Sequence, residues 1–222
     1  MVNNVDVPYP FRSKLSYDIF KNKYQHQGAE TWQELANTLV NQVCSTYMSE
    51  GEKKELIGYM ADMKFIPGGR YLYYAGRPVK FWNNCDLLRA EEDSREDWAN
   101  LSWKAESCLL TGGGIGVDYS RYRDSKQIIK RTGGRASGPI PKMFMVNEIG
   151  RNVMQGGSRR SAIYASLNWR HGDIDWFLGA KDWHNMPVAG TDKTVADLKQ
   201  ANFDYPAPLD CTNISVNYDT AW

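Results

Sequence analysis

Apolar residues recur with a helical period near the start of the chain. Thr31 and Glu34 have the spacing of a capping box, and leucine or valine then recurs at every fourth position from Leu35. This pattern predicts a helix from residue 31 to about residue 48. A second helix is predicted from about 52 to 64, whereas the polar, Pro- and Tyr-containing residues 1–29 predict an extended arm.

Short apolar runs alternate with helical patterns after residue 70. The runs predict strands or extended segments at 71–75, 81–85, 115–119, 161–167 and 213–218. Helices are predicted at 97–110, 139–154 and 173–181, with one or two helical turns near 194–201. Strands that alternate with helices indicate an α/β fold. Gly68 and Gly69 interrupt the helical pattern, so we place a domain boundary between 1–66 and 67–222.

Composition narrows the class of protein. The chain has 222 residues with 27 basic and 26 acidic side chains, a balance that gives no sign of a nucleic-acid-coating surface. No apolar run approaches the roughly 20 residues that span a bilayer, and the N-terminus does not resemble a signal peptide. Four separated cysteines, without a C-x-x-C pair, make a structural zinc site improbable and suggest a reducing cytoplasm. We therefore expect a cytoplasmic protein without a membrane segment or a metal site.

Glycine-rich motifs carry the candidate chemistry. In the stretch 155–162, Gly156 and Gly157 end a predicted helix, and Ser158, Arg159 and Arg160 supply donors suited to phosphates and base edges. Taken alone, this stretch is better explained as an ordinary helix end with solvated arginines.

Two further glycine motifs lie upstream. The triglycine in 111–118 matches neither the dinucleotide-binding fingerprint nor a P-loop, although its amides could bind phosphate or ribose oxygens. A helix end and tight turn explain it equally well. The turn at 133–139 follows a basic loop, 120–136, that suits a polyphosphate, but a solvated charged loop is the commoner case.

Cys85 follows Asn83 and Asn84 after a short aromatic run. A lone cysteine is more often a small buried hydrophobe than a redox centre. By the same reasoning Cys44 and Cys108 are predicted to be core residues, and Cys211 receives no role.

Together these stretches, in this order and approximate spacing, resemble the ribonucleotide reductase large chain over about residues 60–220. The strongest likeness is to the adenosylcobalamin-dependent (class II) ribonucleoside-triphosphate reductases, through 83–85, 133–141, 159–162 and 213–216. The resemblance implies a ten-stranded α/β barrel of two half-barrels behind a small helical domain. Residues 1–66 would be the arm and helical domain, and 67–222 the first half-barrel.

The resemblance also implies a reaction and its residues. In this family a thiyl radical removes the 3′-hydrogen, the 2′-hydroxyl is replaced by hydrogen, and two cysteines supply the reducing equivalents. Cys85 matches the first cysteine of that pair, which reverses the ordinary interpretation of a lone cysteine. The substrate-binding positions implied are Asn84, Gly113, Gly114, Gln155, Gly156, Gly157, Ser158 and Arg159. The effector-binding positions implied are Glu92, Asp93, Lys130 and Arg131.

Cofactor and partners follow from the same resemblance. It implies adenosylcobalamin as the radical source, thioredoxin or glutaredoxin as reductant, a ribonucleotide substrate and a dNTP effector. The short loop 120–136 lacks the insertion of monomeric members, so effector binding would either need a second chain, as in a homodimer, or be lost. No segment resembles the Asn-x-Cys-x-Glu radical site, so we expect activity only with the remaining C-terminal half, either a separate chain or a missing segment.

Three alternatives stay open at this point. The chain could come from an iron-dependent (class I) large subunit, whose radical is made by a separate small subunit. It could be a non-catalytic nucleotide-binding or regulatory module, or an inert remnant that does not fold stably.

Overall fold

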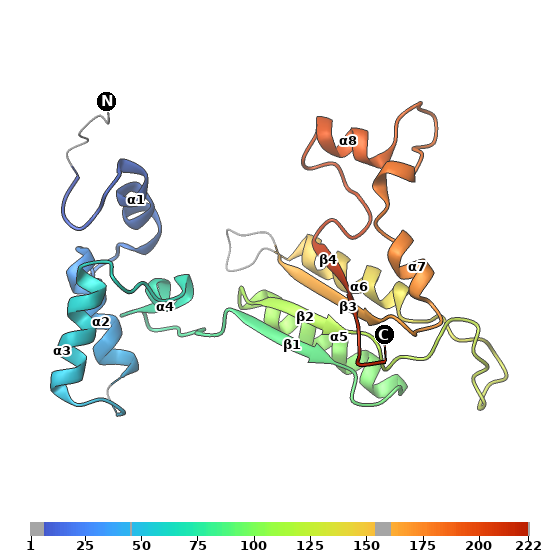
Figure 1. The fold of residues 1–222 in the computed structure, drawn as a ribbon, viewed down its shortest axis with the longest axis horizontal. Coiled ribbons are helices and arrows are strands. Elements are labelled where there is room, and N and C mark those ends of the chain that lie inside the picture. Colours follow the sequence, from blue (N-terminus) through green and yellow to red (C-terminus); the bar gives the residue numbers. More distant parts are fainter. Residues whose placement is uncertain (1–6, 45, 154–160, 222) are drawn as a thin grey trace. The chain divides into compact units, whose positions relative to one another are not determined.

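The computed structural model describes residues 7–44, 46–153 and 161–221. The chain forms two compact units, Met1–Asn84 and Cys85–Trp222 (Figure 1). The predicted boundary at 66/67 falls inside the first unit, because the helix that follows it packs on the N-terminal helices through Leu72 and Ala75.

The N-terminal unit is helical. Its elements are α1 (Lys14–Ile19), a π-helical turn η1 (Phe20–Tyr24), α2 (Trp32–Val43), α3 (Glu50–Ala61) and α4 (Gly69–Tyr74). The predicted capping box is present, since the Thr31 hydroxyl accepts from the Glu34 N–H and the Glu34 carboxylate accepts from the Thr31 N–H. Trp32 anchors the core, and its indole N–H donates to the Met60 carbonyl at 2.7 Å.

Two sequence predictions in this unit are wrong. Residues 14–24 are helical and not part of an extended arm, because Ser13 caps α1 and Phe20 packs edge-on against Trp32. Residues 71–74 belong to helix α4 and not to a strand, since burial of Leu72 on one side favours the helix. Aromatic residues are compatible with both structures, so tertiary packing decides between them.

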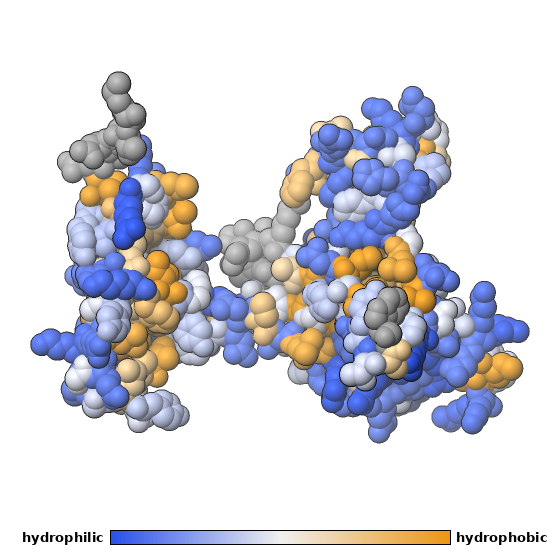
Figure 2. Space-filling model, in the orientation of Figure 1, coloured by the Kyte–Doolittle hydropathy of each residue, from blue (hydrophilic) through white to orange (hydrophobic). Residues whose placement is uncertain are grey.

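An apolar groove of about 480 Å³ lies on the surface of the N-terminal unit. Figure 2 shows a band of hydrophobic residues along this unit. The groove is lined by Leu39, Val40, Val43, Cys44, Leu56, Met60, Phe65, Ile66, Pro67, Gly68 and Tyr71.

The second unit confirms the α/β prediction. Four parallel strands, β1 (Cys85–Arg89), β2 (Gly114–Asp118), β3 (Ile163–Asn168) and β4 (Thr212–Asn217), lie side by side in the order β1-β2-β3-β4. The connections contain α5 (Arg95–Leu110), α6 (Ile140–Asn152), α7 (Ile174–Gly179), a 3-10 turn η2 (Trp183–Asn185) and α8 (Val195–Ala201). The second predicted extended segment, 81–85, becomes a strand only at its last residue, and the strand continues to Arg89.

Helices cover one face of this sheet (Figure 1). Ile115, Val117 and Leu167 point toward Leu109 of α5 and Val146 of α6 in one buried cluster. Because side chains alternate along a strand, the other residues point to the opposite face, which we call the open face. The open face carries Cys85, Leu87, Arg89, Gly114, Gly116, Asp118, Tyr164, Ser166, Asn168, Asn213, Ser215 and Asn217.

The basic loop 120–136 is more ordered than predicted. Its backbone pairs across itself, with Lys126 N–H donating to Ala136 O at 3.0 Å and Ile129 N–H donating to Gly134 O at 2.8 Å. We call 126–136 the hairpin. Among the described residues, no helix is long and apolar enough to cross a membrane.

Candidate functional site

Cys85 and the triglycine come together at one edge of the sheet. Cys85 is the first residue of β1 and is paired in register with Gly114, the first residue of β2. The Cys85 side chain is exposed on the open face. Parallel strands begin at a common edge, so Gly113 lies at the same N-terminal edge. The structure therefore places one predicted thiol beside two predicted backbone binding positions.

The open face next to this edge combines small and large residues. A Cβ on Gly116 would lie 3.3 Å from side-chain atoms of both Leu87 and Tyr164, so these two side chains close in on the glycine from the neighbouring strands. Leu87 is 78% exposed and Tyr164 is 40% exposed. Such exposed apolar groups on a sheet face indicate a surface suited to be covered by further protein or by a ligand.

Polar groups follow toward the other end of the open face. Asn217 donates to Asp118 Oδ1 at 3.2 Å and to Ser166 Oγ at 3.1 Å. The Asp118 carboxylate also accepts from the Ser120 N–H at 3.1 Å. This hydrogen-bond network joins β2, β3 and β4 and makes this end of the open face polar. No sequence motif had indicated it.

The loop predicted to contact substrate lies outside the described residues. Gln155, Gly156, Gly157, Ser158 and Arg159 all fall in 154–160. The structure does describe the residues on either side of this segment. Ser161 Oγ donates to Val153 O at 3.3 Å, and Ile115 N–H donates to Ala162 O at 3.0 Å. The described residues Ser161 and Ala162, which follow this segment, therefore lie at the N-terminal edge that carries Cys85.

Asn84 belongs to the N-terminal unit, in which its side-chain amide lies against Gly68. It directly precedes Cys85 in the sequence. Its predicted role along the substrate stays a prediction.

The predicted effector residues gather at the opposite edge of the sheet, where β1 and β2 end. The Asp93 carboxylate accepts from the Arg123 guanidinium and from Trp98 Nε1 at 3.2 Å. Arg123 Nη2 also donates to the Asp93 carbonyl at 2.8 Å. Asp93 is thus engaged within the protein, whereas Glu92 beside it is exposed.

Lys130 and Arg131 lie at the tip of the hairpin and are exposed. Between the hairpin and the start of α5 is a groove of about 340 Å³, which we call the hairpin groove. It is lined by Asp93, Ser94, Arg95, Trp98, Arg123, Ile129, Ala136 and Ser137. Cationic side chains beside a mainly apolar groove with one indole suit an anionic ligand that carries a flat ring.

Comparison with known proteins is consistent with this arrangement. A family model described as "Ribonucleotide reductase, barrel domain" matches residues 83–201, which is more than half of the chain. The chain belongs to the ribonucleotide reductase family. The match begins two residues before Cys85 and includes β1 to β3, the hairpin and α8.

Individual relatives extend the comparison. The chain is 33% identical over 136 residues to a vitamin B12-dependent ribonucleoside-diphosphate reductase of Thermoplasma acidophilum, covering 61% of this chain and 18% of that protein. It is 33% identical over 114 residues to the ribonucleoside-diphosphate reductase large chain of Cryptosporidium parvum, covering 51% of this chain and 14% of that protein. It therefore spans less than a fifth of the length of these curated relatives.

A solved structure shows the same fold. The Actinobacillus ureae class Id ribonucleotide reductase alpha subunit superposes with a TM-score of 0.66 at 17% sequence identity, covering 78% of this chain and 31% of that chain. The parallel sheet and its helices are thus consistent with part of the reductase α/β barrel.

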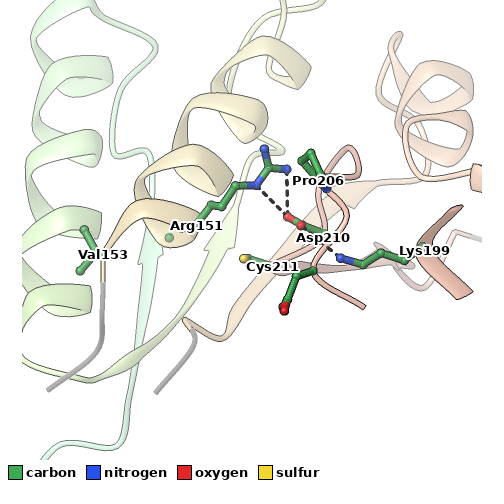
Figure 3. A pocket seen from close by; sticks show the side chains of 8 residues that line it. Arg151, Val153, Lys199, Pro206, Asp210 and Cys211 are labelled. Carbon is green, nitrogen blue, oxygen red and sulfur yellow. Dashed lines mark hydrogen bonds and ion pairs between the residues drawn. The ribbon is translucent and has the colours of Figure 1, made fainter. Parts of the chain in front are cut away.

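Sequence reasoning missed a pocket of about 230 Å³ behind the N-terminal edge. In Figure 3 Asp210 lies between Arg151 of α6 and Lys199 of α8. Arg151 donates to Asp210 Oδ1 from Nε at 3.2 Å and from Nη2 at 3.0 Å, and Lys199 Nζ lies 3.4 Å from Oδ2. Arg151 Nη2 also donates to Ala207 O at 2.7 Å. The charges and hydrogen-bonding groups of Arg151, Asp210 and Lys199 are thus paired with one another. We call these three residues the Asp210 clamp, because they join α6 to the segment before β4.

The Asp210 clamp predicts a pH-dependent contribution to stability. Burial on its own raises the pKa of Asp210, but the hydrogen bond and charge of Arg151, helped by Asn147 and Lys199, bring it below the ordinary value. A carboxyl whose pKa is lowered on folding stabilises the fold above its unfolded pKa of about 3.9, and this contribution is lost as pH falls through the folded pKa. Asp210→Asn should therefore cost about 2 kcal/mol at pH 7, since the side chain is only 12% exposed.

Urea unfolding of both proteins between pH 3 and pH 7 checks this expectation. The difference between wild type and Asp210→Asn should stay constant above about pH 5 and shrink below about pH 4. Asp182→Asn is a control at an exposed carboxylate. A difference that grows as pH falls would contradict the assignment.

Proposed function

We propose that this chain forms the first part of the catalytic barrel of an enzyme that reduces ribonucleotides to 2′-deoxyribonucleotides. The observation that carries the proposal is the position of Cys85, an exposed thiol that starts β1 beside Gly114 within the region matched by the reductase barrel family. Substrate would lie along the N-terminal edge, with its sugar near Cys85 and its phosphates near the amides of Gly113 and Gly114. Asn84 and the loop residues Gln155–Arg159 would complete its surroundings.

The proposed reaction balances through a pair of thiols. A thiyl radical elsewhere in the complete barrel removes the 3′-hydrogen of the ribose, and the 2′-hydroxyl leaves as water. Cys85 and a second cysteine outside this chain then become a disulfide as they deliver two electrons and two protons, and the 3′-hydrogen is returned. Thioredoxin, glutaredoxin or a small dithiol would reduce that disulfide by exchange, which needs a reducing compartment such as the cytoplasm.

Adenosylcobalamin is the radical source that we propose. Support comes from relatives that are named vitamin B12-dependent, such as the T. acidophilum protein. When bound, this cofactor would supply the radical that makes the thiyl. We assign none of the described residues to its binding. The rival source is a radical-generating small subunit, favoured by similarity to the C. parvum large chain and to a Chlamydia pneumoniae subunit alpha.

For the substrate we propose a ribonucleoside triphosphate, following the motif resemblance. The relatives above are named diphosphate reductases, so the diphosphate is the alternative that an assay must include.

The hairpin groove is the proposed site of the dNTP effector. Glu92, Lys130 and Arg131 would contact the ligand, and Asp93 would shape the wall through its pairing with Arg123. A second copy of the chain would complete this site. The exposed Trp103 and Leu110 on α5 and Met145 on α6 support an interface on the outer helices.

Lys130→Ala combined with Arg131→Ala should weaken dNTP binding by about tenfold, because two cations that pair with phosphates are lost at an exposed hairpin tip. Calorimetric titration with each of the four dNTPs measures this, and the tightest binder is used. Lys80→Ala combined with Lys54→Ala, both exposed and in the N-terminal unit, is the charge-matched control. Equal losses in both double variants would point to non-specific charge attraction.

The decisive test is a reductase assay of this chain with the segment that completes the barrel in its relatives. The mixture contains a ribonucleoside tri- or diphosphate, adenosylcobalamin and a dithiol. Deoxynucleotide formation that needs both parts and cobalamin supports the full proposal. Formation that needs a radical-generating subunit instead supports the class I alternative. Nucleotide binding without turnover in either case favours a non-catalytic binding module.

A further inference from the structure

The turn after β3 contains buried polar residues that the proposed function does not use. His171 and Asp173 are both buried, although they lie between a strand end and the short helix α7. Asp173 is only 5% exposed as a side chain. Buried carboxylates are costly unless their oxygens accept hydrogen bonds, so their partners indicate what they are for.

Both hydrogen-bond donors to the Asp173 carboxylate belong to Ser125, at one end of the hairpin, and Gly138, beyond the other end, lies close to the same carboxylate. Asp173 Oδ2 accepts from the Ser125 N–H at 2.7 Å, and Oδ1 accepts from the Ser125 hydroxyl. Ser125 directly precedes Lys126, where the hairpin begins. At the other end, a Cβ on Gly138 would lie 2.4 Å from Asp173 Oδ2 and 2.9 Å from Ser125 N. Gly138 also has φ +74°, so glycine is needed there for both space and backbone conformation.

His171 joins this turn to the chain before the hairpin through its ring nitrogens. Its Nε2 lies 2.7 Å from Tyr122 O, and its Nδ1 lies 3.1 Å from the Asp173 backbone nitrogen. Since the backbone N–H can only donate, Nδ1 is the acceptor and Nε2 carries the proton that Tyr122 O accepts. The neighbouring Gly172 N–H donates to Asp124 Oδ1 at 3.1 Å. The 171–173 turn thus contacts the chain on both sides of the hairpin.

We propose that Asp173, oriented by His171, is a positioning residue that fixes the base of the hairpin and so presents Lys130 and Arg131 to a nucleoside triphosphate in the hairpin groove. This inference rests on the proposed effector site. The hairpin has one isolated bridge, Ile128–Arg135, and an exposed tip, and even a regular two-stranded hairpin is only marginally stable without further packing. The 171–173 turn follows β3, which is an inner strand of the sheet. The attachment therefore fixes the position of the hairpin relative to the sheet.

The chemistry of the carboxylate allows a sharp test. Ser125 presents two donors, and two carboxylate oxygens accept one each. Asp173→Asn keeps the shape but offers one accepting oxygen, so one Ser125 donor loses its partner. Ser125→Ala removes only the hydroxyl donor and is the milder variant if Asp173→Asn folds poorly. Asp175→Asn, an exposed position on α7, is the matched control.

Amide hydrogen exchange of the whole chain is the first measurement. We expect Asp173→Asn to speed exchange of the Lys126, Ile129 and Ala136 amides by about tenfold or more, while the Val117 and Ala165 amides in the sheet are unchanged. The affinity for the tightest-binding dNTP should fall by about tenfold in Asp173→Asn and less in Ser125→Ala, with Asp175→Asn at the wild-type value.

Two results would overturn the inference. Hairpin exchange that is unchanged in both Asp173→Asn and Ser125→Ala would show that the turn does not anchor the hairpin. Faster hairpin exchange with unchanged dNTP affinity would show that the anchor does not serve binding. A wild-type chain that binds no dNTP, with hairpin exchange still controlled by Asp173, would instead refute the proposed effector site and leave the anchor standing.

Discussion

Cys85→Ser should reduce dithiol-dependent deoxynucleotide formation by at least about 10³-fold in the completed enzyme. This corresponds to an activation free energy that is higher by about 4 kcal/mol or more. A serine hydroxyl is close in size to the thiol but cannot be oxidised to a disulfide, so the two-electron step has no donor. Cys85 is exposed on the open face, so the fold and its unfolding midpoint should not change. Nucleotide binding at the far edge of the sheet should also persist.

A second cysteine provides the matched control. Cys108 lies on α5 against the helix-covered side of the sheet, where burial and the nearby Asp86 raise the pKa of its thiol. Cys108→Ser should therefore keep its turnover. Full activity in Cys85→Ser, or equal loss in both variants, would refute the proposed role of Cys85.

Asn147→Ala should destabilise the second unit by about 3 kcal/mol. Asn147 is fully buried in α6, and its side-chain oxygen accepts from Cys211 N–H at 3.1 Å and from the Thr212 hydroxyl at 2.9 Å. Alanine removes the acceptor of two buried donors and leaves a small cavity. It also removes a donor that faces Asp210.

Urea unfolding followed by circular dichroism measures this cost. Asn152→Ala, at an exposed position at the end of the same helix, should change the unfolding free energy by less than about 0.5 kcal/mol. Similar effects of the two substitutions would mean that the buried hydrogen bonds of Asn147 do not set the loss, since helix propensity alone favours alanine over asparagine at both positions.

Local signals predicted much of the second unit. The strand prediction at 115–119 matches β2, and the helix prediction at 97–110 matches α5 nearly to its ends. Alternation of apolar residues and the glycine that ends a helix are local properties, so they survive folding unchanged. The strand prediction for 71–75 failed because aromatic residues fit either structure, and contacts with α2 and η1 favour the helix.

The candidate site residues also divide into those that the sequence indicated and those that only the tertiary structure revealed. Cys85, Gly113 and Gly114 were found because the ordered motifs resemble a known family, and the register of β1 and β2 then brings them together. Asn147, Asp173 and Asp210 were not found, since an isolated Asn or Asp carries no sign of burial. Each of them depends on at least one partner that is 48 to 65 residues away in the sequence, such as Ser125 for Asp173, Arg151 for Asp210 and Thr212 for Asn147.

The sequence by itself determined the helix caps, the alternation that makes an α/β sheet, and the family to which the motifs belong. Each of these depends on neighbouring residues or on the order of motifs along the chain. The tertiary structure alone decided which face of the sheet stays open, which carboxylates are buried, and how the hairpin is attached. Those features arise from contacts between distant segments, because burial and hydrogen-bond satisfaction exist only once the strands and helices have packed.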